Sequence, residues 1–156
     1  MRESRTPLTI LIADDDAGHR LMIRQAFEEA RLINPLRFVE DGEELLEYLC
    51  CRGAYAAAGS APVPGLILLD LKMPGTDGRE ALREIKNHPD LKELPVVILT
   101  ASRAEEEILR TCDLGVDLFI TKPVSFSELV KTVKPHCRCW FEIVTAPGVE
   151  YGGLHD

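Results

Sequence analysis

The most constraining feature of this sequence is a fivefold alternation of short apolar runs with amphipathic segments. The apolar runs are residues 8–13, 36–39, 66–69, 95–100 and 117–123. The segments between them, with apolar residues at helical spacing, predict helices over residues 17–31, 42–51, 79–87, 104–114 and from Ser125 onward. Because the runs are apolar throughout, they predict strands buried on both faces. We therefore expect a doubly wound α/β domain with a five-stranded parallel sheet.

Two segments fall outside this alternation. Residues 53–65 (GAYAAAGSAPVPG) predict a long loop, which is either a surface insertion or a partner-binding segment. We place the domain at residues 1–134 and a C-terminal extension at residues 135–156, where Pro135 should interrupt the last helix and the end from Tyr151 should fray. The apolar residues of the extension either cover the core of the domain or contact a second copy of the chain. They are Trp140, Phe141, Ile143 and Val144.

Composition excludes several classes of partner. The 156 residues suffice for one domain, and 18 basic against 26 acidic residues give a net charge of -8, which argues against nucleic acid. No apolar run approaches the roughly 20 residues that span a bilayer, so we expect no membrane partner. The polar N-terminus, residues 1–7, does not resemble a signal peptide, so we expect a cytoplasmic protein. The 5 cysteines, an odd number without a common zinc spacing, predict reduced thiols.

Polar side chains lie at the carboxyl ends of four of the five predicted strands. In an open parallel sheet, ligands bind beyond the carboxyl ends of the strands, and the predicted strand order is the flavodoxin-like one. We therefore expect these side chains to meet at one edge of the sheet. They are Asp14, Asp15, Asp16, Asp70, Thr100 and Lys122.

These residue types favour phosphoryl transfer. Crowded carboxylates repel one another, and a hard cation such as Mg²⁺, which prefers oxygen ligands, relieves this repulsion. A lysine and a threonine hydroxyl can stabilise the oxygens of a transferred phosphoryl group, and an aspartate can be the nucleophile. Asp16 has an equally plausible structural role as the N-cap of the following helix.

Four motifs resemble those of response regulator receiver domains. They are ILIADDDAG, LLDLKMPGTDG, VVILTAS and LFITKP, and the resemblance extends over residues 8–133. It implies that Asp70 accepts a phosphoryl group from a histidine kinase. The protein would then be a signalling switch that catalyses only its own phosphorylation and dephosphorylation, and is otherwise no enzyme.

The resemblance also implies a metal site. Asp15 and Asp70 would bind Mg²⁺ directly, together with the backbone carbonyl of Lys72. Asp14 would contribute through a water molecule.

The remaining roles that the resemblance implies concern the response to phosphorylation. Thr100 would be a switch hydroxyl and Lys122 would pair with the phosphoryl group. Phe119 lies where the family has a switch aromatic residue; because it has no hydroxyl, its alternative positions would differ by packing alone. The peptide bond before Pro123 is expected to be cis.

The long loop, the segment NPLRFVEDGEELLEYL and the tail WFEIVTAP are similar to stand-alone regulators paired with bacterial phytochromes. This similarity implies a phytochrome-type kinase as partner and a homodimer. No DNA-binding module is expected after the domain, so the output would pass through protein contacts or phosphate flow.

Two alternatives use the same residues. In a haloacid-dehalogenase-like phosphatase, Asp14 would be the nucleophile and Asp16 the acid/base, supported by Thr100 and Lys122; this leaves Asp70 without a role. A flavin-binding domain is less favoured, because acids at the first strand end would repel a phosphate.

Overall fold

A single parallel sheet organises the domain. The computed structural model describes residues 9–57, 59, 61–73, 78–116, 118–133, 143–144 and 150–151. Five strands pair in the order β2-β1-β3-β4-β5, and every neighbouring pair is parallel. The strands are β1 (Thr9–Ala13), β2 (Leu36–Val39), β3 (Pro64–Asp70), β4 (Val96–Thr100) and β5 (Phe119–Thr121). The predicted doubly wound sheet in flavodoxin-like order is therefore confirmed.

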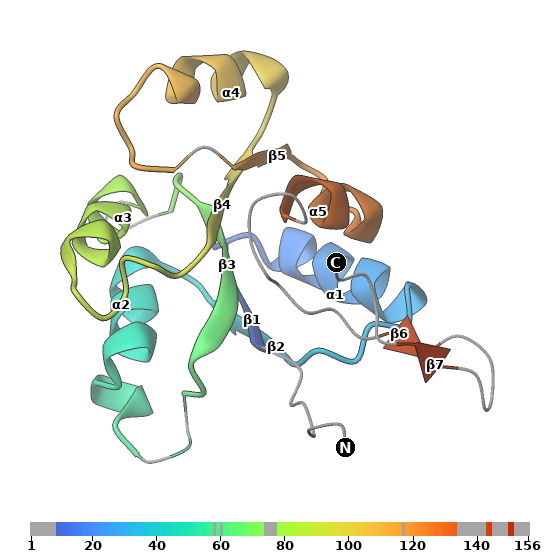
Figure 1. The fold of residues 1–156 in the computed structure, drawn as a ribbon, viewed down its shortest axis with the longest axis horizontal. Helices are drawn as coiled ribbons and strands as arrows, with labels where there is room; N and C mark the ends of the chain where they lie inside the picture. The colour runs from blue at the N-terminus through green and yellow to red at the C-terminus, as the bar shows by residue number, and fades with distance from the viewer. Residues whose placement is uncertain are drawn as a thin grey trace.

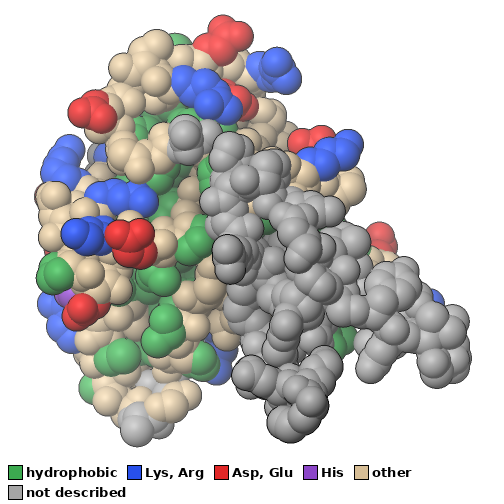
Figure 2. Space-filling model, in the orientation of Figure 1, with side chains coloured by type: hydrophobic (Ala, Val, Ile, Leu, Met, Phe, Trp, Pro, Cys, Tyr) green, Lys and Arg blue, Asp and Glu red, His purple; other side chains and the backbone are tan. Residues whose placement is uncertain are grey.

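Among the described residues, five α-helices cover the two faces of the sheet. They are α1 (Ala17–Glu29), α2 (Gly42–Cys50), α3 (Gly78–Asn87), α4 (Arg103–Arg110) and α5 (Phe126–Val133). Helices α1 and α5 lie on one side of the strands, and α2 and α3 lie on the other (Figure 1). Charged side chains of both signs lie over α4 and along the edge formed by α2 and α3 (Figure 2). Within the described ranges, no helix combines the length and apolar character needed to cross a bilayer.

Alternate residues of each strand enter two separate cores. In β1, Ile10 and Ile12 pack with residues of α1 and α5, whereas Leu11 and Ala13 pack with residues of α2, α3 and α4. All four side chains are fully buried. Because helices cover both faces, neither alternate set of positions in β1 contacts water, which explains why the central strands β1, β3 and β4 are apolar along nearly their whole length.

Several element bounds differ from the predicted ones. Strand β3 begins at Pro64, inside the predicted loop, because Pro64 pairs with Thr9 at the amino-terminal end of β1. Helix α4 ends at Arg110 rather than near residue 114. Thr111, the residue after the helix, donates a side-chain hydrogen bond of 2.6 Å to the carbonyl of Ile108. Strand β5 has 3 residues, far fewer than the predicted run. Apolar character alone did not mark the ends of these elements.

The described part of the long loop packs against α2. After the short 3-10 turn η1 (Gly53–Tyr55), the chain passes Tyr48, whose hydroxyl donates a hydrogen bond of 2.8 Å to the carbonyl of Pro62. The rings of Tyr48 and Tyr55 meet edge to face at 5.0 Å, and the Tyr55 hydroxyl donates to Glu44 at 2.7 Å. Burial and the Glu44 carboxylate raise the pKa of Tyr55 to about 12. Two tyrosines therefore anchor this segment.

In the C-terminal extension, β6 (Ile143–Val144) pairs antiparallel with β7 (Glu150–Tyr151). Tyr151, where the chain was expected to fray, pairs with Ile143 in this ladder. The predictions made for Pro135, Trp140 and Phe141 lie outside the described residues. The described cysteines are free thiols; they are Cys50, Cys51 and Cys112.

Candidate functional site

The carboxyl ends of β1 and β3 bring two buried aspartates together. Ala13 pairs with Leu69 across the sheet, so the residues that follow them, Asp14 and Asp70, lie at the same edge. Asp14 has no exposed surface and Asp70 is 6% exposed, whereas the neighbouring Asp15 is exposed. One carboxylate oxygen from each of these three aspartates lies within 4.8 Å of the others. The structure thus assembles the predicted acid cluster from two strands.

Lys122, just after β5, neutralises part of this cluster. Its ammonium lies 2.6 Å from Oδ2 of Asp70 and 3.3 Å from Oδ2 of Asp14. Burial alone would lower the pKa of Lys122, but the hydrogen bond and charge of Asp70, together with the charge of Asp14, outweigh burial and raise it. Lys122 is therefore cationic at neutral pH and bridges the two buried carboxylates. The peptide bond between Lys122 and Pro123 is cis.

His19 contacts the same cluster and was not predicted from the sequence. It is the first residue of the buried stripe of α1, followed at helical spacing by Ile23 and Phe27. Its Nδ1 makes a short hydrogen bond to Oδ2 of Asp14. Its Nε2 is buried and has no hydrogen-bond partner among the described residues. The only signal in the sequence was a histidine at a position of α1 whose helical neighbours are apolar, four residues after Asp15.

Asp14 is held as a carboxylate by these neighbours. Burial raises its pKa, but the hydrogen bonds from His19 and from the Asp16 amide, together with the charge of Lys122, outweigh burial and lower it. The Asp16 amide donates to Oδ1 at 2.9 Å, so both Asp14 oxygens take part in hydrogen bonds with the protein. Since an ionised carboxylate can only accept, Nδ1 of His19 carries the shared proton.

The side chain of Asp16 has a separate role as the N-cap of α1. Its Oδ1 accepts hydrogen bonds from the amides of Gly18 at 2.9 Å and His19 at 3.3 Å. This capping satisfies amides that have no partner within the helix. Of the two roles considered for Asp16, the structure therefore shows the helix cap.

The backbone just after Asp70 lies in close contact with the start of α3. The amide of Lys72 donates a hydrogen bond of 2.9 Å to Oδ1 of Asp70. Gly78, at the start of α3, lies so near that a Cβ atom added to it would be 2.6 Å from the Cα atom of Leu71. A side chain at this position would push the backbone that follows the phosphoacceptor candidate.

The two predicted switch residues contact β5 and α4. The hydroxyl of Thr100 is buried and lies 3.4 Å from both the Ile120 carbonyl, to which it donates, and the Thr121 hydroxyl. Phe119 is 7% exposed, and the guanidinium of Arg110 lies over its ring, 4.5 Å from the centroid. In this structure, therefore, the Thr100 hydroxyl is bonded toward β5.

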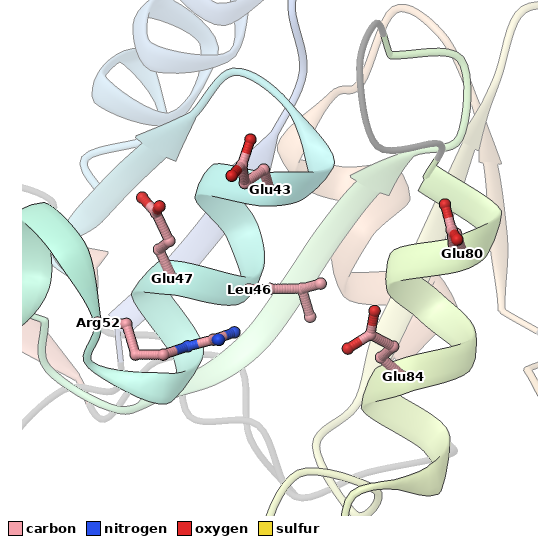
Figure 3. Close-up of a pocket in the computed structure, with 6 residues that line it drawn as sticks. All are labelled: Glu43, Leu46, Glu47, Arg52, Glu80 and Glu84. Carbon is pink, nitrogen blue, oxygen red and sulfur yellow. The ribbon is translucent and has the colours of Figure 1, made fainter.

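A cavity of about 250 Å³ adjoins the acid cluster. Its lining includes Asp70, Lys72 and Glu105, and it has room for a tetrahedral anion beside Asp70. A larger hollow of about 450 Å³ lies between α2 and α3 (Figure 3). It is lined by Glu43, Leu46, Glu47, Arg52, Glu80 and Glu84. Because none of these residues follows a strand of the sheet, this hollow is separate from the candidate site.

The acid cluster fits a hard divalent cation. Three carboxylates offer only oxygen donors, and exposed Asp15 leaves one side accessible to water, which Mg²⁺ usually retains as ligands. Asp14 has no exposed surface, whereas Asp15 is exposed, which favours a contact through water for Asp14 and a direct one for Asp15. Asp15, Asp70 and the carbonyl of Lys72 are the remaining candidate ligands.

The fold and this site define the class of protein. A parallel sheet that brings an acid pair, a third-strand aspartate, a fourth-strand threonine and a lysine together is typical of receiver domains. The sequence profile described as "Response regulator receiver domain" matches residues 10–134, and the chain belongs to this family. The resemblance noted in the sequence is thereby confirmed.

More particular similarities lie with phytochrome-associated regulators. The chain is 36% identical over 145 residues to "Response regulator Rcp1" of Synechocystis sp., which covers 93% of this chain and 97% of that protein. The "bacteriophytochrome response regulator AtBRR" superposes with a TM-score of 0.76 at 36% identity, over 83% of this chain and 91% of that one.

Two further solved structures of similar chains concern a metal-bound and a phosphorylated form. The "Mn(2+)-bound form of response regulator Rcp1" has a TM-score of 0.65 at 35% identity, covering 80% of this chain and 88% of that one. The "Phosphorylated Cyanobacterial Phytochrome Response Regulator RcpA" has a TM-score of 0.65 at 39% identity, covering 80% and 86%. Similar chains have thus been solved with a divalent metal and in a phosphorylated form.

Proposed function

We propose that this protein is a phosphorylation switch whose Asp70 accepts a phosphoryl group from a sensor histidine kinase. The observation that carries the proposal is the convergence of Asp70 with Asp14, Asp15 and Lys122: three carboxylate oxygens within 4.8 Å and an ammonium 2.6 Å from Asp70. Mg²⁺, held by Asp15, Asp70 and the Lys72 carbonyl, and by Asp14 through water, would neutralise charge on the transferred group.

The transfer is a displacement at phosphorus. An oxygen of Asp70 attacks the phosphorus atom, the bond from phosphorus to the donor imidazole nitrogen breaks, and the imidazole leaves with that electron pair. Lys122, already at the attacking carboxylate, then pairs with a phosphoryl oxygen. The hydrogen bond and the charge of Asp70, with the charge of Asp14, maintain its positive charge against the effect of burial.

Thr100 and Phe119 would couple phosphorylation of Asp70 to a change in the protein surface formed by α4 and β5. The hydrogen bond of Thr100 to the Ile120 carbonyl is long, at 3.4 Å, so little energy opposes rotation of the hydroxyl toward a phosphoryl oxygen. Rotation of Thr100 alters the packing next to β5, where Phe119 lies beneath Arg110. Phosphorylation would thus bias a two-state surface at α4 and β5.

The similar proteins indicate the kind of kinase. Because relatives over most of the chain are named as phytochrome response regulators, we infer a phytochrome-type kinase, a cytoplasmic location and an output through protein contacts. From the same similarity, we infer that two copies of this chain form a homodimer. Light scattering of the full chain and of a chain truncated after Lys134 tests it, and a monomer mass for the full chain would contradict it.

The phosphoacceptor is tested with acetyl phosphate, a small donor that bypasses the kinase. With Mg²⁺, the wild-type chain should gain one phosphoryl group by mass spectrometry, and Asp70→Asn should gain none. Labelling at Asp14 would instead support the phosphatase alternative. Against that alternative, Asp14 is fully buried and Asp16 caps a helix.

A further inference from the structure

Glu105, in the first turn of α4, connects the two chain segments that leave β3 and β4. Its Oε1 accepts a hydrogen bond of 2.7 Å from the amide of Ala101, the residue after Thr100. Its Oε2 lies 2.5 Å from the ammonium of Lys72, two residues after Asp70. One carboxylate therefore spans the edge of the sheet where the candidate site lies.

The contact with Ala101 belongs to the capping of α4. Ser102 is the N-cap of α4, and its hydroxyl accepts from the Glu105 amide at 3.1 Å, as in the first half of a capping box. The glutamate of a capping box bonds back to the N-cap amide, which would be that of Ser102. Here it reaches one residue further, to Ala101. Helix α2 has the same arrangement, since Glu44 accepts a hydrogen bond of 2.9 Å from the Glu40 amide. The feature that distinguishes Glu105 is its second contact, the ion pair with Lys72 beside Asp70.

The side chain of Glu105 is a mostly buried anion close to the phosphoacceptor candidate. It is 18% exposed and lines the same cavity as Asp70. Its carboxylate forms an ion pair with Lys72, which lines the cavity, and accepts a hydrogen bond from the Ala101 amide. Glu105 therefore places a paired negative charge in the wall of the cavity.

We infer that Glu105 is an internal anion that holds the first turn of α4 against the site. A phosphoryl group on Asp70 would displace the Glu105 carboxylate from this position. The inference rests on the proposed phosphorylation of Asp70. Phosphorylated Asp70 carries about two negative charges where the free carboxylate carries one, and this added charge in the cavity repels Glu105. The phosphoryl oxygens also compete for the Lys72 ammonium and the Ala101 amide, because charge-assisted hydrogen bonds to phosphate are strong.

Displacement of Glu105 has a structural consequence at β5. Helix α4 also carries Arg110, whose guanidinium covers the ring of Phe119. If the first turn of α4 is released, the packing of Arg110 on the ring of Phe119, the predicted switch residue, therefore weakens. In this way Glu105 couples occupancy of the cavity to the position of α4.

The test measures binding of trifluoroberyllate, a phosphoryl analogue, to the full-length protein with saturating Mg²⁺ by calorimetry. Glu105→Gln keeps the size of the side chain and its acceptor for the Ala101 amide but removes the charge. We expect it to bind the analogue about tenfold more tightly than wild type, since one repulsive charge is lost at close range. Glu107→Gln, at an exposed position of the same helix, makes the same change in net charge and should bind like wild type.

A second readout follows the displaced contact itself. In the wild-type protein with bound trifluoroberyllate, a crystal structure should show Glu105 beyond hydrogen-bond distance from both the Ala101 amide and the Lys72 ammonium. Retention of either contact, or equal affinities of wild type and Glu105→Gln, would overturn the displacement. The proposed function stands in those cases if Asp70→Asn binds no analogue. If wild type also binds none and gains no phosphoryl group from acetyl phosphate, both proposals are wrong.

Discussion

The ammonium of Lys122 lies 2.6 Å from Oδ2 of Asp70, although 52 positions separate them in sequence. The same ammonium lies 3.3 Å from Asp14. Before any metal or phosphoryl group is bound, one lysine therefore compensates two buried carboxylates. This relationship makes the stability of the protein depend on the charges of its site.

Removal of the Lys122 charge should destabilise the protein when no metal is bound. In Lys122→Gln, Asp14 and Asp70 lose their shared cation, so we expect the free energy of unfolding in EDTA to fall by about 1–3 kcal/mol. Because Mg²⁺ can replace the missing charge, it should stabilise this variant more than wild type. Urea denaturation with and without Mg²⁺ measures both effects, and Lys131→Gln, at an exposed position of α5, is the control. Equal stabilisation of both proteins by Mg²⁺ would contradict the bridging role of Lys122.

Stability should also depend on pH through Asp14. Its pKa in the folded state lies below the ordinary value of 3.8, so an unfolded chain takes up this proton first as the pH falls. The stabilising contribution is therefore complete above about pH 4 and is lost as the pH falls through the folded-state pKa. In EDTA, the difference in free energy of unfolding between wild type and Asp14→Asn should shrink below about pH 4. A difference that stays constant or grows would show that the Asp14 pKa is not lowered.

The contact of His19 with Asp14 should appear as a coupling energy. His19→Leu removes the donor to Asp14, and Asp14→Asn removes the charge that accepts it. A double-mutant cycle of these two substitutions, measured by urea denaturation in EDTA, should give a coupling of about 1–2 kcal/mol. Strictly additive effects would indicate that His19 only fills space at the end of the α1 stripe.

Gly78 should tolerate no side chain. In Gly78→Ala, the new Cβ would lie 2.6 Å from Leu71 Cα and 2.8 Å from its carbonyl oxygen, both backbone atoms, so the segment after Asp70 must shift. We expect a loss of about 1–3 kcal/mol in the free energy of unfolding and slower phosphorylation by acetyl phosphate. Gly18→Ala in α1, where the nearest atom is 3.3 Å away in a side chain, is the matched control and should be close to neutral. Wild-type rates for Gly78→Ala would show that the backbone approach is not needed.

The predicted fold was correct because its signals are local and repeated. Five apolar runs, each followed by a helical pattern, left few alternatives to a covered parallel sheet, and the carboxyl ends of its strands located the acids. The ends of elements were less predictable. Helix α4 stops at Arg110 and β5 has 3 residues, because capping by Thr111 and pairing at the edge of the sheet decide those ends.

By itself, the sequence determined the class of fold and the set of groups that meet at one edge of its sheet, including Asp14, Asp70 and Lys122. Periodicity and strand ends specify these features, because they depend on neighbours along the chain. Only the tertiary structure decided which atoms pair: that His19 reaches Asp14, that Lys122 bridges two acids and that Glu105 reaches Ala101. Each of these contacts is selected among competing donors and acceptors by how helices pack on the sheet, and no sequence spacing encodes that competition.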